Sequence, residues 1–145
     1  MRRVIQAALA MLLLSGTEVQ AQTTSVSGPP MELDAATTRR LFAAMTQDLK
    51  NLVTAQELYF SERAEYAPGF QRGAIKGAVL RASPGVTVTL TYVTKQTYAA
   101  RATHDWMPGR SCVMTVGAVA ASRVPVTTAE KRAPRREAVP VCDAR

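Results

Sequence analysis

The chain has 145 residues, with 18 Lys and Arg against 11 Asp and Glu, for a net charge of +7. This length favours one domain over two or more. The basic balance could attract nucleic acid, anionic lipid or an acidic partner, although the same charge also serves solubility alone.

The first residues are typical of an export signal. Residues 1–3 are a short basic start, and the stretch 4–14 is apolar apart from one glutamine. A polar stretch follows and ends in Val-Gln-Ala at 19–21, with short side chains at the two positions that a signal peptidase reads. The apolar run is about 11 residues long, well short of the ~20 that span a bilayer.

We therefore expect residues 1–21 to be a cleaved signal peptide, with a retained membrane anchor as the alternative. The mature protein is then periplasmic or extracellular and has no transmembrane span after processing. Removal of the signal leaves about 120 residues, the size of one domain. Residues 22–33 begin with Thr, Ser, Gly and Pro and predict a flexible leader, and residues 34–145 form the folded domain.

A long helix is predicted directly after the leader. Asp34 can cap its first turn, and no Gly or Pro occurs from 35 to about 65. Apolar side chains recur at spacings of three and four along this stretch, which indicates one amphipathic helix. At 1.5 Å per residue it extends for about 46 Å, so an unbroken helix can overhang the sheet at its first turns.

Alternation with a period of two predicts a sheet in the second half of the chain. Residues 86–92 alternate apolar side chains with threonine, and 98–103 alternate again after a short turn, so the pair should form an antiparallel hairpin. A third strand is predicted at 112–116, and 139–142 returns as a short edge strand that tolerates its proline. We expect an α+β fold, with one long N-terminal helix packed on a half-buried, three- to four-stranded antiparallel sheet.

Two connecting segments complete the expected fold. Residues 70–84 contain turn-forming Gly and Pro, and Ile75, Val79 and Leu80 should pin this segment to the core. Residues 118–138 form a long, basic excursion between the third and fourth strands.

The cysteine count predicts one covalent link. Cys112 and Cys142 are the two cysteines of the chain, and in an exported protein they suggest a disulfide. Closing the loop between them stabilises the fold by roughly 3–4 kcal/mol if the gain is the lost entropy of the unfolded chain. Two unrelated free thiols are the alternative.

Several segments, taken in order, resemble the globular domain of type IV pilin-like proteins. The family helix is similar to DLKNLVTAQELYF (48–60), and its first two sheet strands are similar to SPGVTVT (83–89) and YAARATH (98–104). The strands that carry the family's C-terminal disulfide are similar to SCVMTVG (111–117) and VPVCD (139–143).

The resemblance implies a non-enzymatic, exported structural or accessory subunit of an envelope or extracellular assembly, such as a type IV pilus. Its partners would be other envelope or extracellular protein subunits. The family's usual leader and its apolar N-terminal helix of ~20 residues are not matched, and Arg39 and Arg40 stand at the start of the helix here. Burying two arginines in a filament core would be costly, which favours an accessory role over filament building.

Two apolar features are candidate partner surfaces. An overhanging helix start would present Leu41, Phe42 and Met45 to a protein groove or a membrane surface. The alternative is that these side chains fold onto the domain's own loops. Trp106 lies in a predicted loop and is a second candidate, with folding back over the sheet edge as its alternative.

A run of basic residues is the candidate anion-binding site. Lys131, Arg132, Arg135 and Arg136 could contact phosphates, which supports an alternative function as a binding module for nucleic acid or an anionic surface polymer. No aromatic residue in the run offers the stacking that single-strand binders use. A simpler interpretation is a solvated loop that folding does not need.

No residue pattern favours catalysis. His104, Asp105 and Ser111 could form a triad on paper, but adjacent strand residues point to opposite faces, so Asp105 is poorly placed to orient His104. Close Cys or His pairs of the kind that bind zinc do not occur in the sequence. We expect no enzymatic activity, no metal and no cofactor.

Overall fold

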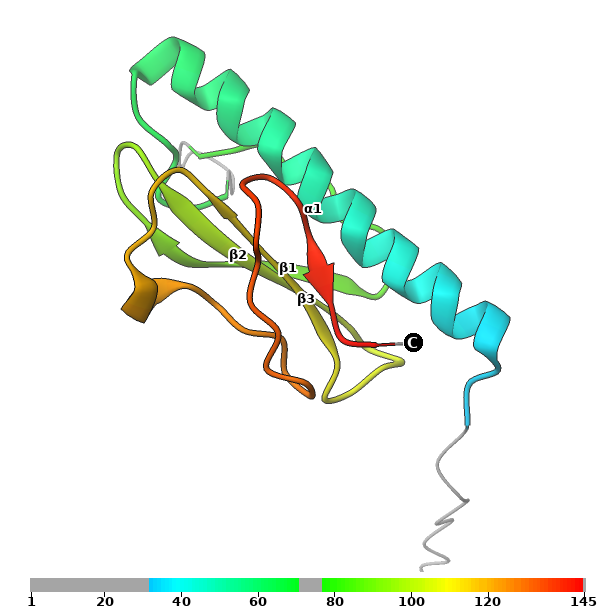
Figure 1. The fold of residues 1–145 in the computed structure, drawn as a ribbon. Coiled ribbons are helices and arrows are strands. Elements are labelled where there is room, and N and C mark those ends of the chain that lie inside the picture. Colours follow the sequence, from blue (N-terminus) through cyan, green and yellow to red (C-terminus); the bar gives the residue numbers. More distant parts are fainter. Residues whose placement is uncertain (1–31, 71–76, 145) are drawn as a thin grey trace, which may run out of the picture. The chain divides into compact units, whose positions relative to one another are not determined.

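A computed structural model describes residues 32–70 and 77–144 of the chain. The expected signal peptide, almost all of the expected leader, and Ile75 lie outside these residues. The described elements follow in the order α1 (Ala35–Arg63), β1 (Val86–Val93), β2 (Tyr98–His104), β3 (Ser111–Val116), the 3-10 helix η1 (Ala121–Arg123) and β4 (Val141–Cys142). One helix packs on an antiparallel sheet, so the prediction of an α+β fold is confirmed (Figure 1).

Helix α1 begins and ends where the sequence provides caps. The Asp34 carboxylate accepts hydrogen bonds from the backbone N–H of Ala36 at 2.8 Å and of Thr37 at 2.9 Å. The Thr37 hydroxyl donates to the same carboxylate at 2.6 Å and is the main cause that lowers the pKa of Asp34. At the other end Ala64 adopts a left-handed φ of 55°, which closes the last turn. No helix within the described residues is both long enough and apolar enough to cross a membrane.

The four strands are antiparallel and lie in the order β1-β2-β3-β4. The predicted hairpin is present, with Val88 opposite Ala102, and Ala102 opposite Cys112 of β3. The last strand is short: β4 pairs with β3 through two residue pairs, one of which is Cys112 opposite Cys142. The hydrogen-bonded contact between β3 and β4 is thus small, and other interactions must hold the end of the chain.

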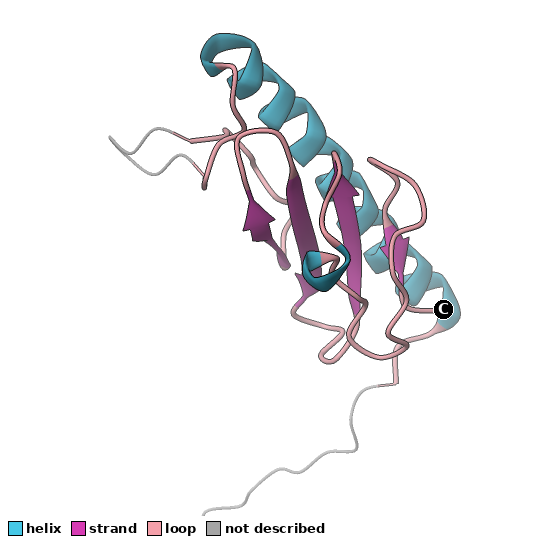
Figure 2. Ribbon diagram, turned by 60° about the vertical axis from the view of Figure 1, so that its left-hand side comes forward, coloured by secondary structure: helices cyan, strands magenta, loops and turns pink. Residues whose placement is uncertain are grey.

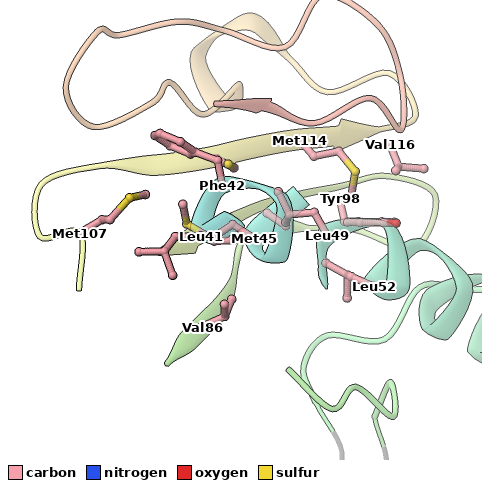
Figure 3. Packing of buried hydrophobic residues seen from close by; sticks show 13 residues of the cluster. Leu41, Phe42, Met45, Leu49, Leu52, Val86, Tyr98, Met107, Met114 and Val116 are labelled. Carbon is pink, nitrogen blue, oxygen red and sulfur yellow. The ribbon is translucent and has the colours of Figure 1, made fainter. Parts of the chain in front are cut away.

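Helix α1 covers one face of the sheet and forms the core with it (Figure 3). Ala100 and Ala102 of β2 belong to this core and are completely buried. Their small side chains leave room for the larger side chains of α1, such as Leu49 and Leu52, which are also completely buried.

The excursion between β3 and β4 covers the opposite face of the sheet (Figure 2). Ala99 and Val113 point away from α1 by strand alternation, yet both are fully buried. Arg101 on the same face donates from Nη2 to the carbonyl of Val126 at 3.0 Å. The expected half-buried sheet is therefore wrong for β2 and β3, because the excursion supplies a second covering layer.

The segment before β1 is fastened by a polar contact as well as an apolar one. Val79 is 63% exposed, so its predicted role as a core anchor is wrong, whereas Leu80 packs against the core as expected. The segment is also held by Asp48 of α1, which is buried and accepts from the Ser83 N–H at 2.6 Å and the Ser83 hydroxyl at 3.0 Å.

Candidate functional site

The start of α1 is part of the core. Leu41 and Phe42 are 9% and 3% exposed, and Met45 is completely buried. All three belong to the same cluster as Met107 and Cys112 (Figure 3). The prediction of an exposed partner surface at these three residues is therefore wrong. The physical reason is that the domain's own sheet and the loop after β2 cover this face of the helix.

A large apolar side chain of α1 is exposed nearer the other end of the helix. Leu58 is 60% exposed and lines an open hollow of about 300 Å³ together with Tyr59 and Val79. With about 3.6 residues per turn, Leu58 lies on nearly the opposite side of the helix from the buried stripe of Met45, Leu49 and Leu52, and this position is the signal that could have indicated its exposure.

Trp106 lies at the surface. Its side chain is 64% exposed, so it does not fold back over the sheet edge. Its backbone N–H donates to Nδ1 of His104 at 3.1 Å, and the two rings lie 5.9 Å apart. His104 is the last residue of β2 and is buried, rather than part of the predicted loop. Its ring lies so close to Gly85 that a Cβ there would be 2.8 Å from Cε1.

The structure does not form a triad from His104, Asp105 and Ser111. The Ser111 hydroxyl is fully buried and bonds to the backbone N–H of Thr128 at 2.8 Å and to the Thr128 hydroxyl at 2.9 Å. Nδ1 of His104 already accepts from the backbone of Trp106, and the Asp105 side chain is exposed. Across residues 32–70 and 77–144, His, Cys, Asp and Glu side chains nowhere gather in a group that could hold a metal ion.

The predicted disulfide is present and joins β3 to β4 through Cys112 and Cys142. The two cysteines are directly opposite each other in the sheet. The Thr46 hydroxyl of α1 lies 3.4 Å from the Cys142 sulfur, so the disulfide also contacts the helix.

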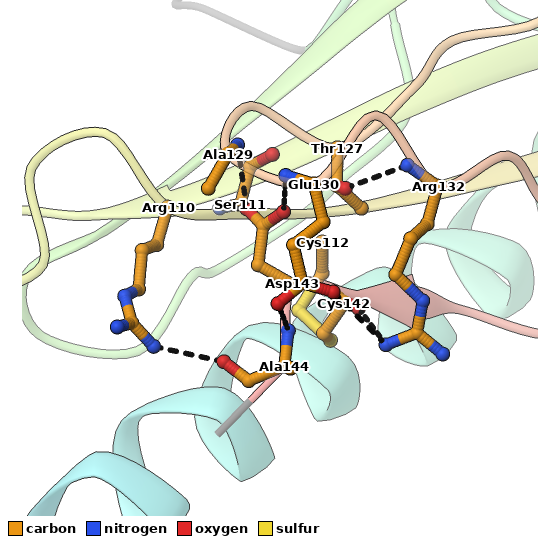
Figure 4. A network of polar contacts seen from close by, with 10 residues as sticks. All are labelled: Arg110, Ser111, Cys112, Thr127, Ala129, Glu130, Arg132, Cys142, Asp143 and Ala144. Carbon is orange, nitrogen blue, oxygen red and sulfur yellow. Dashed lines mark hydrogen bonds and ion pairs between the residues drawn. A yellow bond between two sulfur atoms is a disulfide. The ribbon is translucent and has the colours of Figure 1, made fainter.

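A buried carboxylate next to the disulfide fixes the end of the chain (Figure 4). Asp143 is 3% exposed and accepts from the backbone N–H groups of Ser111 at 2.8 Å, Ala129 at 3.2 Å and Glu130 at 2.7 Å. Burial alone would raise the pKa of Asp143, but hydrogen bonds from the Thr127 hydroxyl and these N–H groups lower it below the ordinary value. The role of Asp143 was not predicted from the sequence, where its only distinguishing feature is its position beside Cys142.

The buried polar side chains share one role. Six of them are buried in the described residues, and each accepts a hydrogen bond from a backbone N–H group. The pairs are Asp48 with Ser83, Gln56 with Ala67, His104 with Trp106, Ser111 with Thr128, Thr127 with Arg132, and Asp143 with Ser111, Ala129 and Glu130. The buried hydroxyl of Tyr98, by contrast, has no partner among the described residues. The contact between Thr127 and Arg132 lies within the excursion, and the other five contacts fasten connecting segments to the helix or the sheet.

The basic run gathers at one hollow of about 660 Å³. Its lining includes Lys131, Arg132, Arg135 and Arg136 together with apolar side chains of the last segment of the chain. The four charged side chains are exposed, which agrees with a solvated loop. Arg132 is nevertheless attached to the domain, because its Nη1 donates to the carbonyl of Cys142 at 2.8 Å.

Comparisons of the chain with protein-family models, with curated proteins and with solved structures found no match.

Proposed function

We propose that the mature chain is an exported, non-enzymatic domain of pilin-like architecture that acts as a structural or accessory subunit of an envelope or extracellular assembly. The observation that supports this most is the use of the six buried polar side chains. In an enzyme, buried titratable groups usually face a cleft where a substrate can reach them. Here each of them binds a backbone N–H group, so the polar chemistry of the interior serves the shape of the domain.

The architecture is compatible with the same proposal. A long amphipathic helix on an antiparallel sheet, with a disulfide between β3 and β4, is the arrangement that the resemblance to pilin-like proteins implies. The disulfide and the Asp143 hydrogen bonds hold the last segment firmly, and a disulfide suits an oxidising environment outside the cytoplasm.

The partner contact that fits this structure best is Trp106. Its indole is large, apolar and 64% exposed, and its backbone is held by the hydrogen bond to His104. A rigidly held tryptophan is a common anchor of protein interfaces, because it buries a large area at little entropic cost. We therefore propose the loop after β2, rather than the start of α1, as the partner contact.

The test is the native assembly state of wild-type protein and two variants. Envelope and secreted fractions are cross-linked and separated by size, and the cross-linked subunits are identified by mass. We expect the wild type in a complex with a fixed set of other subunits. Trp106→Ala should reduce incorporation by tenfold or more, as for an interface anchor, while the matched control Leu58→Ala leaves it unchanged.

Two outcomes would contradict the proposal. One is a wild-type chain that stays monomeric in every native fraction. The other is an equal loss of incorporation in both variants, which would point to general loss of surface hydrophobicity rather than to a site at Trp106.

A further inference from the structure

The hollow at the basic run lies on the side of β4 that faces away from α1. Cys142 faces the helix, since its sulfur lies 3.4 Å from the Thr46 hydroxyl, and its neighbour Val141 therefore points to the other side. Val141 and Val139 both line the hollow, and Val139 is 47% exposed. The hollow thus has an apolar floor that remains open to solvent.

The charge around this floor is of one sign. Four cationic side chains line the hollow, and no acidic residue does. The two acids of the same segment are bound to backbone amides elsewhere: Glu137 accepts from the N–H of Gly117 at 2.7 Å, and Glu130 accepts from the N–H of Ala144 at 2.7 Å. Only a loose ion pair of 3.8 Å between Glu130 and Arg132 offsets part of the positive charge.

The four cations fall into two pairs with different tasks. Lys131 donates to the carbonyl of Thr128 at 2.7 Å, and Arg132 donates to the carbonyl of Cys142, so these two side chains hold the loop against the domain. Arg135 and Arg136 make no side-chain hydrogen bond or ion pair with any other described residue. Their guanidinium groups are therefore free to meet an anion at the rim of the hollow.

The combination of free arginines and an exposed apolar floor selects the chemistry of the ligand. Guanidinium groups bind phosphate oxygens through paired hydrogen bonds. A nucleic acid would match the charge, but the lining contains no aromatic side chain on which a base could stack, and it would leave the valines without a contact. An anionic phospholipid satisfies both parts, because its phosphate meets the arginines while its glycerol and upper acyl chain cover the valines.

We propose that this hollow is a docking site for the surface of a membrane that contains anionic phospholipid. Clusters of Lys and Arg are drawn to such surfaces, and apolar side chains inserted at the headgroup level add to the binding. The site does not depend on the assembly role proposed above, since it uses none of the residues around Trp106.

The experiment measures co-sedimentation of the purified, exported protein with vesicles. One set of vesicles contains phosphatidylcholine with phosphatidylglycerol, and the other contains phosphatidylcholine alone. We expect binding to the anionic vesicles only, weakening as salt is raised. The double variant Arg135→Gln, Arg136→Gln should bind roughly 25-fold more weakly, from the usual contribution of two basic residues at a membrane surface.

Matched controls distinguish binding at this hollow from attraction by the net charge of the protein. The variant Arg39→Gln, Arg40→Gln removes the same charge from exposed positions of α1, and its binding should change by no more than about twofold. Val139→Ser keeps every charge and should weaken binding by about threefold, because the apolar contact is lost. Thermal unfolding midpoints of all variants should match the wild type, since the changed side chains are exposed.

Three results would overturn the proposal. Equal losses in the two arginine pairs would show that only net charge matters. An unchanged affinity in Val139→Ser would exclude the apolar floor from the contact. Tighter binding to a DNA duplex than to anionic vesicles at the same salt concentration would assign the arginines to nucleic acid instead.

Discussion

Replacing Asp143 with asparagine tests the hydrogen bonds that hold the end of the chain. One carboxylate oxygen of Asp143 accepts from Glu130 N–H, and the other accepts from the N–H groups of Ser111 and Ala129. An asparagine side chain keeps one oxygen and presents an NH₂ group in place of the other. Whichever way the amide turns, at least one backbone N–H then faces a donor and loses its partner; in one orientation this is the buried N–H of Ser111.

The size of the effect follows from the type of bond. A hydrogen bond to a charged group contributes about 1.5–3 kcal/mol, and a buried donor left without a partner costs about 1–3 kcal/mol. Allowing for partial relaxation, we expect Asp143→Asn to lower the free energy of unfolding by about 3 kcal/mol. That is a large share of the roughly 5–15 kcal/mol by which small domains are stable.

The assay is urea unfolding followed by far-ultraviolet circular dichroism, because the exposed Trp106 makes fluorescence a weak reporter. Asp105→Asn, at an exposed carboxylate, is the control and should shift the free energy of unfolding by less than about 0.5 kcal/mol. A midpoint of Asp143→Asn equal to that of the wild type, with the same slope, would refute the reasoning.

The pH dependence gives a second check on the same pair of proteins. The folded state lowers the pKa of Asp143 below its ordinary value of 3.8, so the carboxylate stabilises the fold fully above that pH. This contribution is lost as the pH falls through the lowered folded-state pKa. The difference in unfolding free energy between wild type and Asp143→Asn should therefore be constant near neutrality and shrink below about pH 4.

Three further predictions follow from the buried contacts. Gln56→Ala should lower the free energy of unfolding by about 2 kcal/mol, because it leaves the backbone N–H and carbonyl of Ala67 without their partner. The exposed control Gln47→Ala should change it by less than about 0.5 kcal/mol. Denaturant midpoints measure both variants, and equal shifts would contradict the buried role of Gln56. Cys142→Ser should lower the free energy of unfolding by roughly 2–5 kcal/mol in the same assay, and thiol labelling of the folded wild type should find no free cysteine. An unchanged midpoint or a labelled thiol would argue against a structural disulfide. Phe42→Glu should lower stability by several kcal/mol, because it places a charge in the core; a soluble variant with the wild-type melting temperature would restore the start of α1 as a partner surface.

Local patterns in the sequence predicted the elements of the fold well. The helix was expected at 35–65 and is α1 at Ala35–Arg63, because caps and apolar spacing are both encoded in neighbouring residues. The strands and the hairpin followed from alternation in the same way. The disulfide was predictable from the presence of two cysteines in a chain whose first residues are typical of an export signal.

The covering of each surface could not be predicted, because it depends on residues far apart in the chain. The spacing of Leu41 and Phe42 assigns them to the apolar face of the helix. It does not show that the sheet and the loop after β2 cover them. The length of the helix alone does not show whether it projects beyond the sheet, or at which end. The roles of the Asp48 and Asp143 carboxylates could not be predicted for a related reason, since their partners lie 13 to 35 positions away in the chain.

Hydrogen bonds from loop amides to buried side chains tie the proton exchange of the loops to that of the core. In an ordinary surface loop, backbone amides exchange with solvent through small local fluctuations that cost little free energy. The amides of Ala67, Ser83 and Thr128 are instead bound to buried side chains of α1 and β3, so their exchange requires that a buried polar group lose its partner. The loops then open together with the helix and the sheet, as parts of one cooperative unit. A partner that binds such loops meets a surface that is already ordered. Binding then costs little conformational entropy, because the loops do not have to be ordered by the partner.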